Sequence, residues 1–486
     1  MTLNRSGQRV IASIFFAALA VLYGIAWLSP AIGLFHDDAI YLVTAKAISA
    51  GHGYRIESLP EPILQTKYPP LFPALLALFT LVSANAQWLK LLPLACTAAW
   101  LIVTRRLLIR MGASQGDALV LVALTAASPL VLFLSTNLLS ETLFALLITA
   151  TLLMLIEEHA FAAAILAGLA VMTRTAGGPV IVACIVTLVV RRRFRGAVIF
   201  AAVSVLLVAP WLGWSLAHVP HDSYYGANNY VASNIATGLA ANEKFVVLTR
   251  NFLLLLATPL SLLTGFNNVW AVGSTLLLLV VCFYKQRQLV PDLFLGLYCL
   301  MLLGWAWPPE RFVAPVLPLV LWIVWRVILR TRLREALAAC VIIVAMLALW
   351  ADVRRIPQPG GQTGNNWAEM RKMFTFIKAN TPRDSVLLAN LDPLFYLNTG
   401  RKAIRGFAPN GFGLYYATTQ AGVTPDQLST AIQRSQVNYV VLTPDRDFAE
   451  SASFHSSVEA LERGGVLQPV AIAGISPEYR LLQVTR

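Results

Sequence analysis

Acidic residues that follow the first apolar run are the strongest candidates for chemistry in this sequence. His36-Asp37-Asp38 comes shortly after an apolar segment at residues 10–29 and before an amphipathic segment at residues 39–50. Asp38 is expected to cap the helix that begins at residue 39. Asp37 would then be available to take a proton from an acceptor hydroxyl. The two roles can also be exchanged, because predicted helix starts shift by a residue or two.

A lysine in a proline-containing segment is the first candidate for binding an anion. The segment Thr66-Lys67-Tyr68-Pro69-Pro70 precedes an apolar stretch of about 12 residues, 71–82, which is too short for an ordinary membrane crossing. Prolines are common where a helix begins, so the segment has a purely structural interpretation. In the functional interpretation Lys67 contacts a phosphate group at the lipid surface.

Further charged residues stand at the ends of predicted membrane spans. Glu141 opens the segment 140–156, where a helix N-terminus favours a carboxylate. Arg174 and Arg311 lie at the outer ends of other spans, where each could simply extend to the interface, and Glu310 precedes Arg311. Ionisable groups at membrane depth are functional candidates. Acids beside bases suit a reaction that joins a hydroxyl acceptor to a lipid-phosphate donor.

The composition indicates a protein that faces lipid over much of its surface. The 486 residues are 57% hydrophobic and 13% charged, whereas a soluble protein carries roughly 25% charged residues. We therefore predict an all-α polytopic bundle of about eleven transmembrane helices. The predicted spans are 10–29, 86–104, 118–134, 140–156, 160–174, 177–190, 196–214, 267–284, 290–306, 311–328 and 335–351.

The positive charge is concentrated between these spans. The formal net charge is +13, and its clusters lie at 105–110, 191–195, 285–287 and 330–334. This distribution follows the positive-inside rule and argues against nucleic-acid binding. It predicts a cytoplasmic N-terminus, with the first loop, 30–85, on the opposite side of a bacterial inner membrane. A turn at Glu157-Glu158-His159 is the exception, since it would be cytoplasmic without positive charge.

The distribution of acidic residues divides the chain near residue 352. Residues 1–351 hold 13 of the 24 acidic residues, and residues 352–486 hold the other 11. We expect a transmembrane catalytic domain at 1–351 and a soluble, periplasmic or extracellular α/β domain at 352–486. Helical patterns at 367–379 and 424–434 alternate there with strand patterns at 385–389 and 438–442. No nucleotide-binding fingerprint is present, none of the five cysteines has metal-ligand spacing, and no cofactor is indicated, with a divalent metal left open.

Several short motifs, in order along the chain, resemble those of bacterial family 39 glycosyltransferases. These are relatives of the protein O-mannosyltransferases and of the aminoarabinose transferase that modifies lipid A. The matching elements are Phe35-His36-Asp37-Asp38 with Tyr41, Ala45 and Gly51-His52-Gly53-Tyr54; Lys67-Tyr68-Pro69-Pro70, which has a tyrosine inserted into a Lys-Pro-Pro motif; Ser140-Glu141; Thr173-Arg174, with arginine in place of lysine; and Arg311-Phe312 with Pro315.

The resemblance implies the GT-C fold, a helical bundle whose large first loop holds the active site. It implies a polyprenyl-phosphate-linked sugar as donor and Asp37 or Asp38 as catalytic base, assisted by Glu141. Lys67, Arg174 and Arg311 would bind the phosphate. Tyr68 and Glu310 complete the expected substrate-binding set.

The leading hypothesis is therefore a membrane glycosyltransferase that transfers a hexosyl or pentosyl group to a hydroxyl of a lipid, glycan or protein at the periplasmic face. A transporter or flippase of lipid-linked sugars is the alternative. Against it stands the lack of internal repeats and of paired broken helices. A non-catalytic docking protein, with the tail binding a partner, is a third hypothesis. The expected partners are the lipid-linked donor, the acceptor and membrane lipids.

Overall fold

The computed structural model describes residues 5–219, 241–264, 288–305, 307, 309–328, 334–354, 366–407, 422–444 and 450–485. The predicted span at 267–284 and the basic cluster at 285–287 lie outside these residues. The described part is mostly helical, with a small sheet near the C-terminus. Packing divides the chain into two compact units. We call them the bundle unit (Met1–Ser29, Lys90–Pro210 and Leu248–Pro357) and the loop–tail unit (Pro30–Leu89, Trp211–Val247 and Gln358–Arg486).

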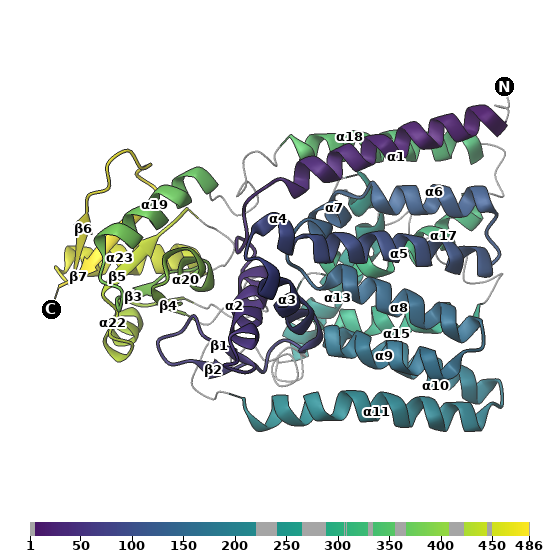
Figure 1. Ribbon diagram of the computed structural model, residues 1–486, viewed down its shortest axis with the longest axis horizontal. Helices are drawn as coiled ribbons and strands as arrows, with labels where there is room; N and C mark the ends of the chain where they lie inside the picture. Colours follow the sequence, from purple (N-terminus) through teal and green to yellow (C-terminus); the bar gives the residue numbers. More distant parts are fainter. Residues whose placement is uncertain are drawn as a thin grey trace. The chain divides into compact units, whose positions relative to one another are not determined.

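The bundle unit is built from helices, most of which lie in segments predicted as spans (Figure 1). They are α1 (Arg5–Trp27), α5 (Leu91–Arg110), α6 (Gln115–Ala126), α7 (Pro129–Ser135), α8 (Glu141–Ile156), α9 (Ala160–Thr173), α10 (Gly178–Val190), α11 (Phe194–Ala217), α13 (Ala241–Thr264), α15 (Leu289–Leu303), α16 (Glu310–Val313), α17 (Leu317–Ile328) and α18 (Arg334–Val353). Several of these elements continue beyond the borders of the bundle unit. Short connections join α8, α9, α10 and α11, so consecutive helices run in opposite directions.

Only some of these helices have the length of a membrane crossing. Among the described residues, two helical segments are long and apolar enough to cross a bilayer, Ala86–Arg110 and Phe194–Ala217. A third is added if α6 and α7, which are bent by 70°, form one crossing. The other helices do not combine this length with this apolar composition over the described residues, so the number of spans stays a prediction.

The span predicted at 118–134 is bent, because the chain changes direction by 70° between α6 and α7. Ser128 has ψ 125°, outside the helical range, and Pro129 opens α7. A residue before proline avoids the α region, since the proline ring clashes with its backbone. The span predicted at 311–328 is also interrupted, by a 3-10 turn at Ala314–Val316 that contains a proline.

The first loop forms a compact group of short elements. It contains α2 (Asp37–Ser49), the antiparallel pair β1 (Arg55–Ile56) and β2 (Ile63–Leu64), α3 (Leu71–Val82) and α4 (Ala86–Leu89). The short apolar helix predicted at 71–82 is confirmed. It packs on α2 through the Tyr41 and Phe72 rings, whose centroids are 5.0 Å apart.

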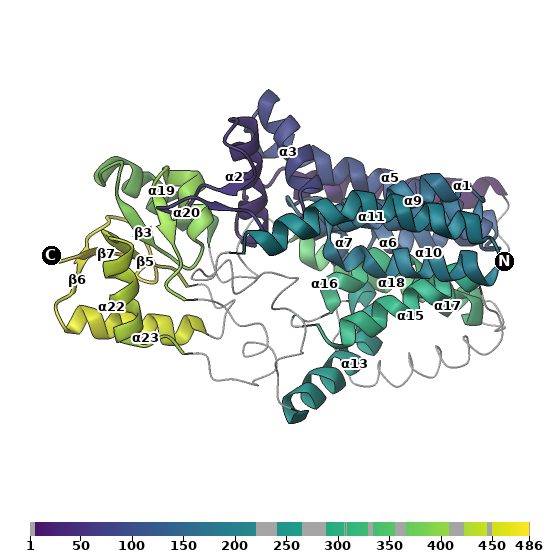
Figure 2. The ribbon, with the colours of Figure 1, turned by 90° about the horizontal axis from the view of Figure 1, so that it is seen from below.

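The tail folds as a three-layer α/β domain, as the alternating pattern predicts. Its elements are α19 (Trp367–Asn380), β3 (Val386–Leu388), α20 (Asp392–Thr399), β4 (Lys402–Ile404), α22 (Pro425–Arg434), β5 (Tyr439–Leu442), α23 (Glu450–Arg463), β6 (Leu467–Val470) and β7 (Arg480–Val484). The strand order is β4-β3-β5-β7-β6. The pairs among β4, β3 and β5 are parallel and the other two are antiparallel. Figure 2 shows α19 and α20 on one face of the sheet and α22 and α23 on the other, each over its own apolar core.

The first loop and the tail pack together inside the loop–tail unit. Ala31 belongs to the same buried cluster as the α19 side chains. The backbone N–H of Ala403 donates to the Ser58 carbonyl at 2.8 Å. A Cβ added to Gly33, which has φ +98°, would lie only 2.8 Å from Leu394 of α20. The predicted division at residues 351 and 352 stays a prediction, but packing groups the loop with the tail.

Candidate functional site

Asp37 and Asp38, the two adjacent aspartates at the start of α2, have different surroundings. The helix begins at Asp37, and its N-cap residue, His36, makes no side-chain capping bond. The expectation that Asp38 caps a helix beginning at residue 39 is therefore wrong. The Asp38 carboxylate is buried and accepts the backbone N–H groups of Gly33, Phe35 and Ala39, which closes the turn ahead of the helix. Burial raises the pKa of Asp38 to about 6, and these N–H donors oppose the shift.

His36 occupies a strained backbone conformation directly before this pair. Its φ is 63° and its ψ is −53°. The N–H of Asp37 donates to the Phe35 carbonyl at 2.7 Å, across His36. This is the γ-turn with positive φ, a rare and strained arrangement that persists only where the surrounding structure holds it. The turn reverses the chain just before α2 and directs the two carboxylates to different surroundings.

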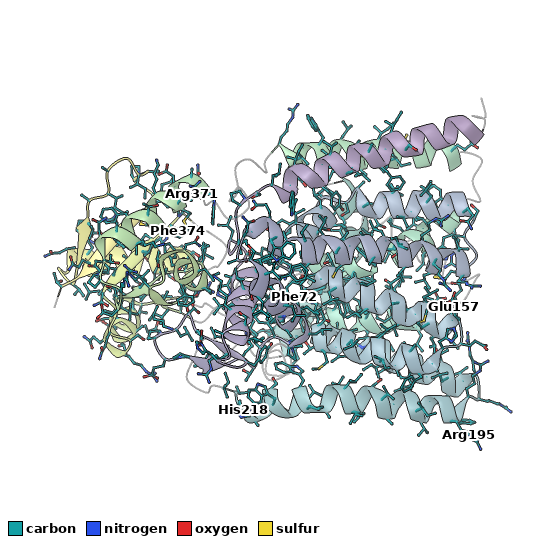
Figure 3. The ribbon with its side chains drawn as sticks, viewed as in Figure 1. Phe72, Glu157, Arg195, His218, Arg371 and Phe374 are labelled. Atoms are coloured by element: carbon teal, nitrogen blue, oxygen red, sulfur yellow. The ribbon has the colours of Figure 1, made fainter. Side chains whose placement is uncertain are left out.

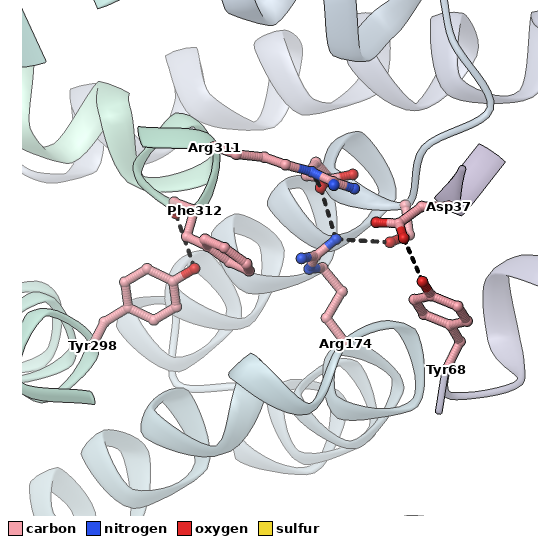
Figure 4. A network of polar contacts seen from close by, with 8 residues as sticks. Asp37, Tyr68, Arg174, Tyr298, Arg311 and Phe312 are labelled. Atoms are coloured by element: carbon pink, nitrogen blue, oxygen red, sulfur yellow. Dashed lines mark hydrogen bonds and ion pairs between the residues drawn. The ribbon is translucent and has the colours of Figure 1, made fainter. Parts of the chain in front are cut away.

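Asp37 is paired with the tyrosine that the sequence inserts into the lysine–proline motif. The Tyr68 hydroxyl donates a hydrogen bond to Asp37 Oδ1 (Figure 4). Tyr68 is itself buried, with its ring centroid 4.8 Å from that of Tyr41. Asp37 is only half-buried, whereas Asp38 is 2% exposed. Of the two, Asp37 is the more exposed carboxylate.

Lys67 lies in the same group of residues. Its side chain is buried, and its Nζ is 4.9 Å from the centroid of the Tyr68 ring. The backbone N–H groups of Lys67 and Tyr68 donate to Gln65 Oε1 at 3.0 and 3.4 Å. The loop–tail unit thus brings together three residues that the sequence singled out: Asp37, Lys67 and Tyr68.

A buried charged cluster that sequence reasoning missed links the first loop to the tail. His36 Nε2 lies 3.4 Å from Asp392 Oδ1, and Arg405 Nε lies 3.8 Å from the same oxygen. All three side chains are buried. Burial lowers the pKa of His36 to about 4, with Arg405 adding to the effect, so the imidazole is neutral at neutral pH. No local pattern pointed to Asp392 or Arg405, because their partner is more than 300 residues away in the chain.

The bundle unit brings together three more of the predicted residues, Glu141, Arg174 and Arg311, in a second cluster. Glu141 is the first residue of α8 and is 1% exposed. Its Oε1 accepts from Arg174 Nη1 at 2.7 Å and from Arg311 Nε. Arg174 Nη1 also lies 3.1 Å from Ser140 Oγ, and its guanidinium carbon lies 5.1 Å from the centroid of the Phe312 ring. Figure 4 shows the two guanidinium groups turned toward the same carboxylate.

Two guanidinium groups and one carboxylate meet in this cluster. The side chains of Arg174 and Arg311 are 11% and 18% exposed. Glu141 Oε2 has no hydrogen-bond partner among the described residues. Glu310, the first residue of α16, makes no ion pair with this cluster in the described part of the chain. The cluster places two guanidinium groups side by side, the kind of donor that binds carboxylate and phosphate groups.

Metal binding receives no support from the described residues. They contain no group of three or more histidine, cysteine, aspartate or glutamate side chains that could hold a metal ion. His218 stacks on Trp214, with ring centroids 4.2 Å apart.

Comparisons with known proteins identify the fold. No family model and no curated protein matches the chain. Among solved structures, ArnT from Cupriavidus metallidurans bound to undecaprenyl phosphate is 12% identical, with a TM-score of 0.61 over 99% of this chain and 98% of that one. The apo state of the same protein gives 13% identity and a TM-score of 0.52 over the same shares.

A third similar structure is the Archaeoglobus fulgidus oligosaccharyltransferase tethered with an acceptor peptide. It is 12% identical, with a TM-score of 0.53 over 88% of this chain and 68% of that one. Both proteins have the GT-C fold, so the fold expected from the family resemblance is confirmed.

Proposed function

We propose that this chain is a membrane glycosyltransferase that moves a hexosyl or pentosyl group from a polyprenyl-phosphate donor to a hydroxyl of a lipid, glycan or protein acceptor. The observation that carries the proposal is the pair of guanidinium groups, Arg174 and Arg311, that meet at a buried Glu141 in a bundle with the GT-C fold. The similar structure of ArnT holds undecaprenyl phosphate, which supports a lipid phosphate as the carrier of the donor sugar.

The arginine cluster would bind the phosphate of the donor. Guanidinium groups bind phosphate through two parallel N–H donors, and such charge-assisted bonds are strong where water is scarce. Glu141 holds both guanidinium groups in place before the donor arrives. This preorganisation matters because the phosphate gains negative charge as the bond to the sugar breaks. Lys67 of the first loop would supply a further positive charge.

Asp37 is the proposed general base. The acceptor oxygen forms a bond to the anomeric carbon while the bond between that carbon and the phosphate oxygen breaks. The phosphate leaves with the electron pair of the broken bond, and the acceptor proton passes to the Asp37 carboxylate. Tyr68 orients that carboxylate through its hydroxyl. Asp38 would support the loop rather than react, since its oxygens already bind three backbone N–H groups.

The test compares turnover of the two aspartate variants in purified protein supplied with polyprenyl-phosphate sugars. Asp37→Asn should lower turnover by roughly 10²- to 10⁴-fold, the usual contribution of a general base, while donor binding survives. Asp38→Asn should lower turnover less than Asp37→Asn does. Glu61→Gln, an exposed acid of the same loop, is the matched control and should change nothing. If neither aspartate variant loses more than a few-fold, the loop carboxylates are structural and the proposal for the base fails.

Donor binding tests the phosphate site separately. Lys67→Ala and Arg174→Ala should each raise the donor KM, because each removes a positive charge proposed to contact the phosphate. Unchanged donor KM values in both variants would remove these residues from the site. Donor binding without transfer to any acceptor would instead favour a carrier of lipid-linked sugars.

The proposed sidedness places the reaction at the periplasmic face of a bacterial inner membrane. It depends on the arginine distribution, with 191–195 cytoplasmic and 352–486 on the opposite side. Single cysteines placed in each segment and labelled on intact cells would test it. Labelling of the tail only after permeabilisation would contradict this topology.

A further inference from the structure

A positively charged cavity lies in the bundle unit, at the far end of the helices that carry Glu141 and Arg174. It has a volume of about 600 Å³, and its lining includes Glu158 and all the arginines of the segment 191–195. Glu141 begins α8, and Glu158 follows the end of that 16-residue helix, so the two ends are about 24 Å apart. Figure 3 labels Glu157 and Arg195 at this same end of the bundle. The proposed transfer reaction therefore makes no use of the cavity.

The backbone holds these arginines in a closed turn. Only Arg191–Arg193 separate α10 from α11. Arg192 has φ 57°, and the N–H groups of Arg192 and Arg193 donate to the carbonyls of Val189 and Leu188, each at 2.8 Å. This pattern terminates a helix with a left-handed residue and leaves little backbone freedom. The arginine side chains thus project from defined positions.

Most of the positive charge in the cavity is not neutralised by the residues that the structure describes. Arg193 pairs with Glu158 at 2.6 Å. The neighbouring Glu157 is bound by arginines of α5 and does not offset the rest. Arg191, Arg192 and Arg195 make no side-chain hydrogen bond or ion pair with any residue that the structure describes. Three guanidinium groups therefore face a cavity that contains one acid, and that acid is already paired.

The first turn of α11 adds hydrogen-bond donors to the same cavity. Phe194, Arg195 and Gly196 line it. The first backbone bond recorded there is from the N–H of Ala197 to the carbonyl of Arg193. The N–H groups of the three preceding residues are left without a partner inside the helix, as at any helix N-terminus, and such groups favour anions.

The residues around the cavity are apolar and exposed. Such surroundings favour a lipid over a free anion as the ligand of the cavity. Val190, Phe194 and Val198 are 60%, 59% and 67% exposed. α11 is one of the two helices long and apolar enough to cross a bilayer. A cationic cavity bordered by such a surface lies where the apolar part of a membrane meets its headgroups.

We propose that this cavity binds the phosphate of an anionic phospholipid headgroup, with the acyl chains along the exposed apolar surface of α10 and α11. The arginines would donate to the phosphate oxygens, and the first turn of α11 would supply further N–H donors. This site is independent of the proposed glycosyl transfer, because it lies at the other end of the helices.

The test measures lipid binding by native mass spectrometry of the full chain purified in detergent, titrated with dioleoyl phosphatidylglycerol. The wild-type chain should bind this lipid at least about tenfold more tightly than the zwitterionic dioleoyl phosphatidylcholine. Replacing Arg191, Arg192 and Arg195 by glutamine should weaken phosphatidylglycerol binding by about fivefold per arginine, on the order of 100-fold together. These side chains are exposed, so the variant should keep the thermal stability of the wild type.

A matched control removes three arginines at the same end of the bundle but outside the cavity. Arg105, Arg106 and Arg110 are exposed and are already bound to Gln115 or Glu157. Their replacement by glutamine should change phosphatidylglycerol binding by less than about threefold. Equal losses in the two triple variants, or no loss in the cavity variant, would overturn the proposal. Inorganic phosphate that displaces phosphatidylglycerol at equal concentration would show a site for the free anion instead.

Discussion

Two buried residues of the first loop should have opposite effects on how the free energy of unfolding changes with pH. His36 and Asp38 are 6% and 2% exposed. Burial lowers the pKa of His36 from 6.5 to about 4 and raises that of Asp38 from 3.8 to about 6. Both shifts disfavour the charged form, but one group loses a positive charge and the other loses a negative charge. The variants His36→Asn and Asp38→Asn separate the two effects.

The sign of each effect follows from which state binds more protons. Between about pH 4 and 6 the unfolded chain protonates His36 while the folded chain does not, so this residue makes stability rise with pH. Over the same window the folded chain keeps Asp38 protonated while the unfolded chain does not, so this residue makes stability fall with pH. A change of one in pKa corresponds to about 1.4 kcal/mol, so each of these two changes contributes about 3 kcal/mol to the free energy of unfolding.

The assay is guanidinium unfolding of the purified chain in detergent at several pH values from 4 to 7. The reference is the double variant, which carries both His36→Asn and Asp38→Asn. Relative to this reference, the free energy of unfolding of the wild type should change by less than about 1 kcal/mol from pH 4 to 6. That of Asp38→Asn should rise by about 3 kcal/mol, and that of His36→Asn should fall by about the same amount. Parallel curves for all four proteins would refute the reasoning, because they would show that neither group is buried in the folded chain.

Three further variants test the polar contacts of the two clusters. Glu141→Gln removes the carboxylate that two arginines share, so the free energy of unfolding should fall by about 3 kcal/mol in the same titration; an unchanged value would contradict the ion pairs. Tyr68→Phe removes the hydroxyl donor of Asp37, and turnover should fall about tenfold at unchanged donor KM, since a hydrogen bond to a charged group contributes about 1.5–3 kcal/mol. Asp392→Asn removes the carboxylate that contacts His36 from the tail, and this contact would help to position the loop that carries Asp37. Turnover should therefore also fall at unchanged donor KM. A changed donor KM with full turnover would argue against this positioning role.

Much of the helical architecture could be predicted because it depends on local composition. Each apolar run predicted as a span and lying in the described residues contains helix, and the short apolar segment at 71–82 forms α3. The tail alternates helices and strands as its pattern indicates. The bend before Pro129 was missed although its signal was present, since a residue before proline leaves the helical region.

The sequence by itself determined which residue types meet the membrane border and in what order they occur. Apolar runs form helices wherever lipid or a bundle core can receive them, and that preference needs no distant partner. The excess of arginine between certain runs, and the acids and bases at the ends of others, are equally local properties. They were sufficient to select Asp37, Asp38, Glu141, Arg174 and Arg311 as candidates.

Only the tertiary structure gives the two adjacent aspartates different hydrogen-bond partners and different burial. Both have the same side chain and neighbouring positions, so no local pattern separates them. The γ-turn at His36 directs the Asp38 carboxylate to three backbone N–H groups, while the Tyr68 hydroxyl reaches Asp37 from 31 residues away. His36, the central residue of this turn, also contacts Asp392 of the tail. Hydrogen-bond partners far apart in the chain are chosen by packing, and packing is a property of the whole fold.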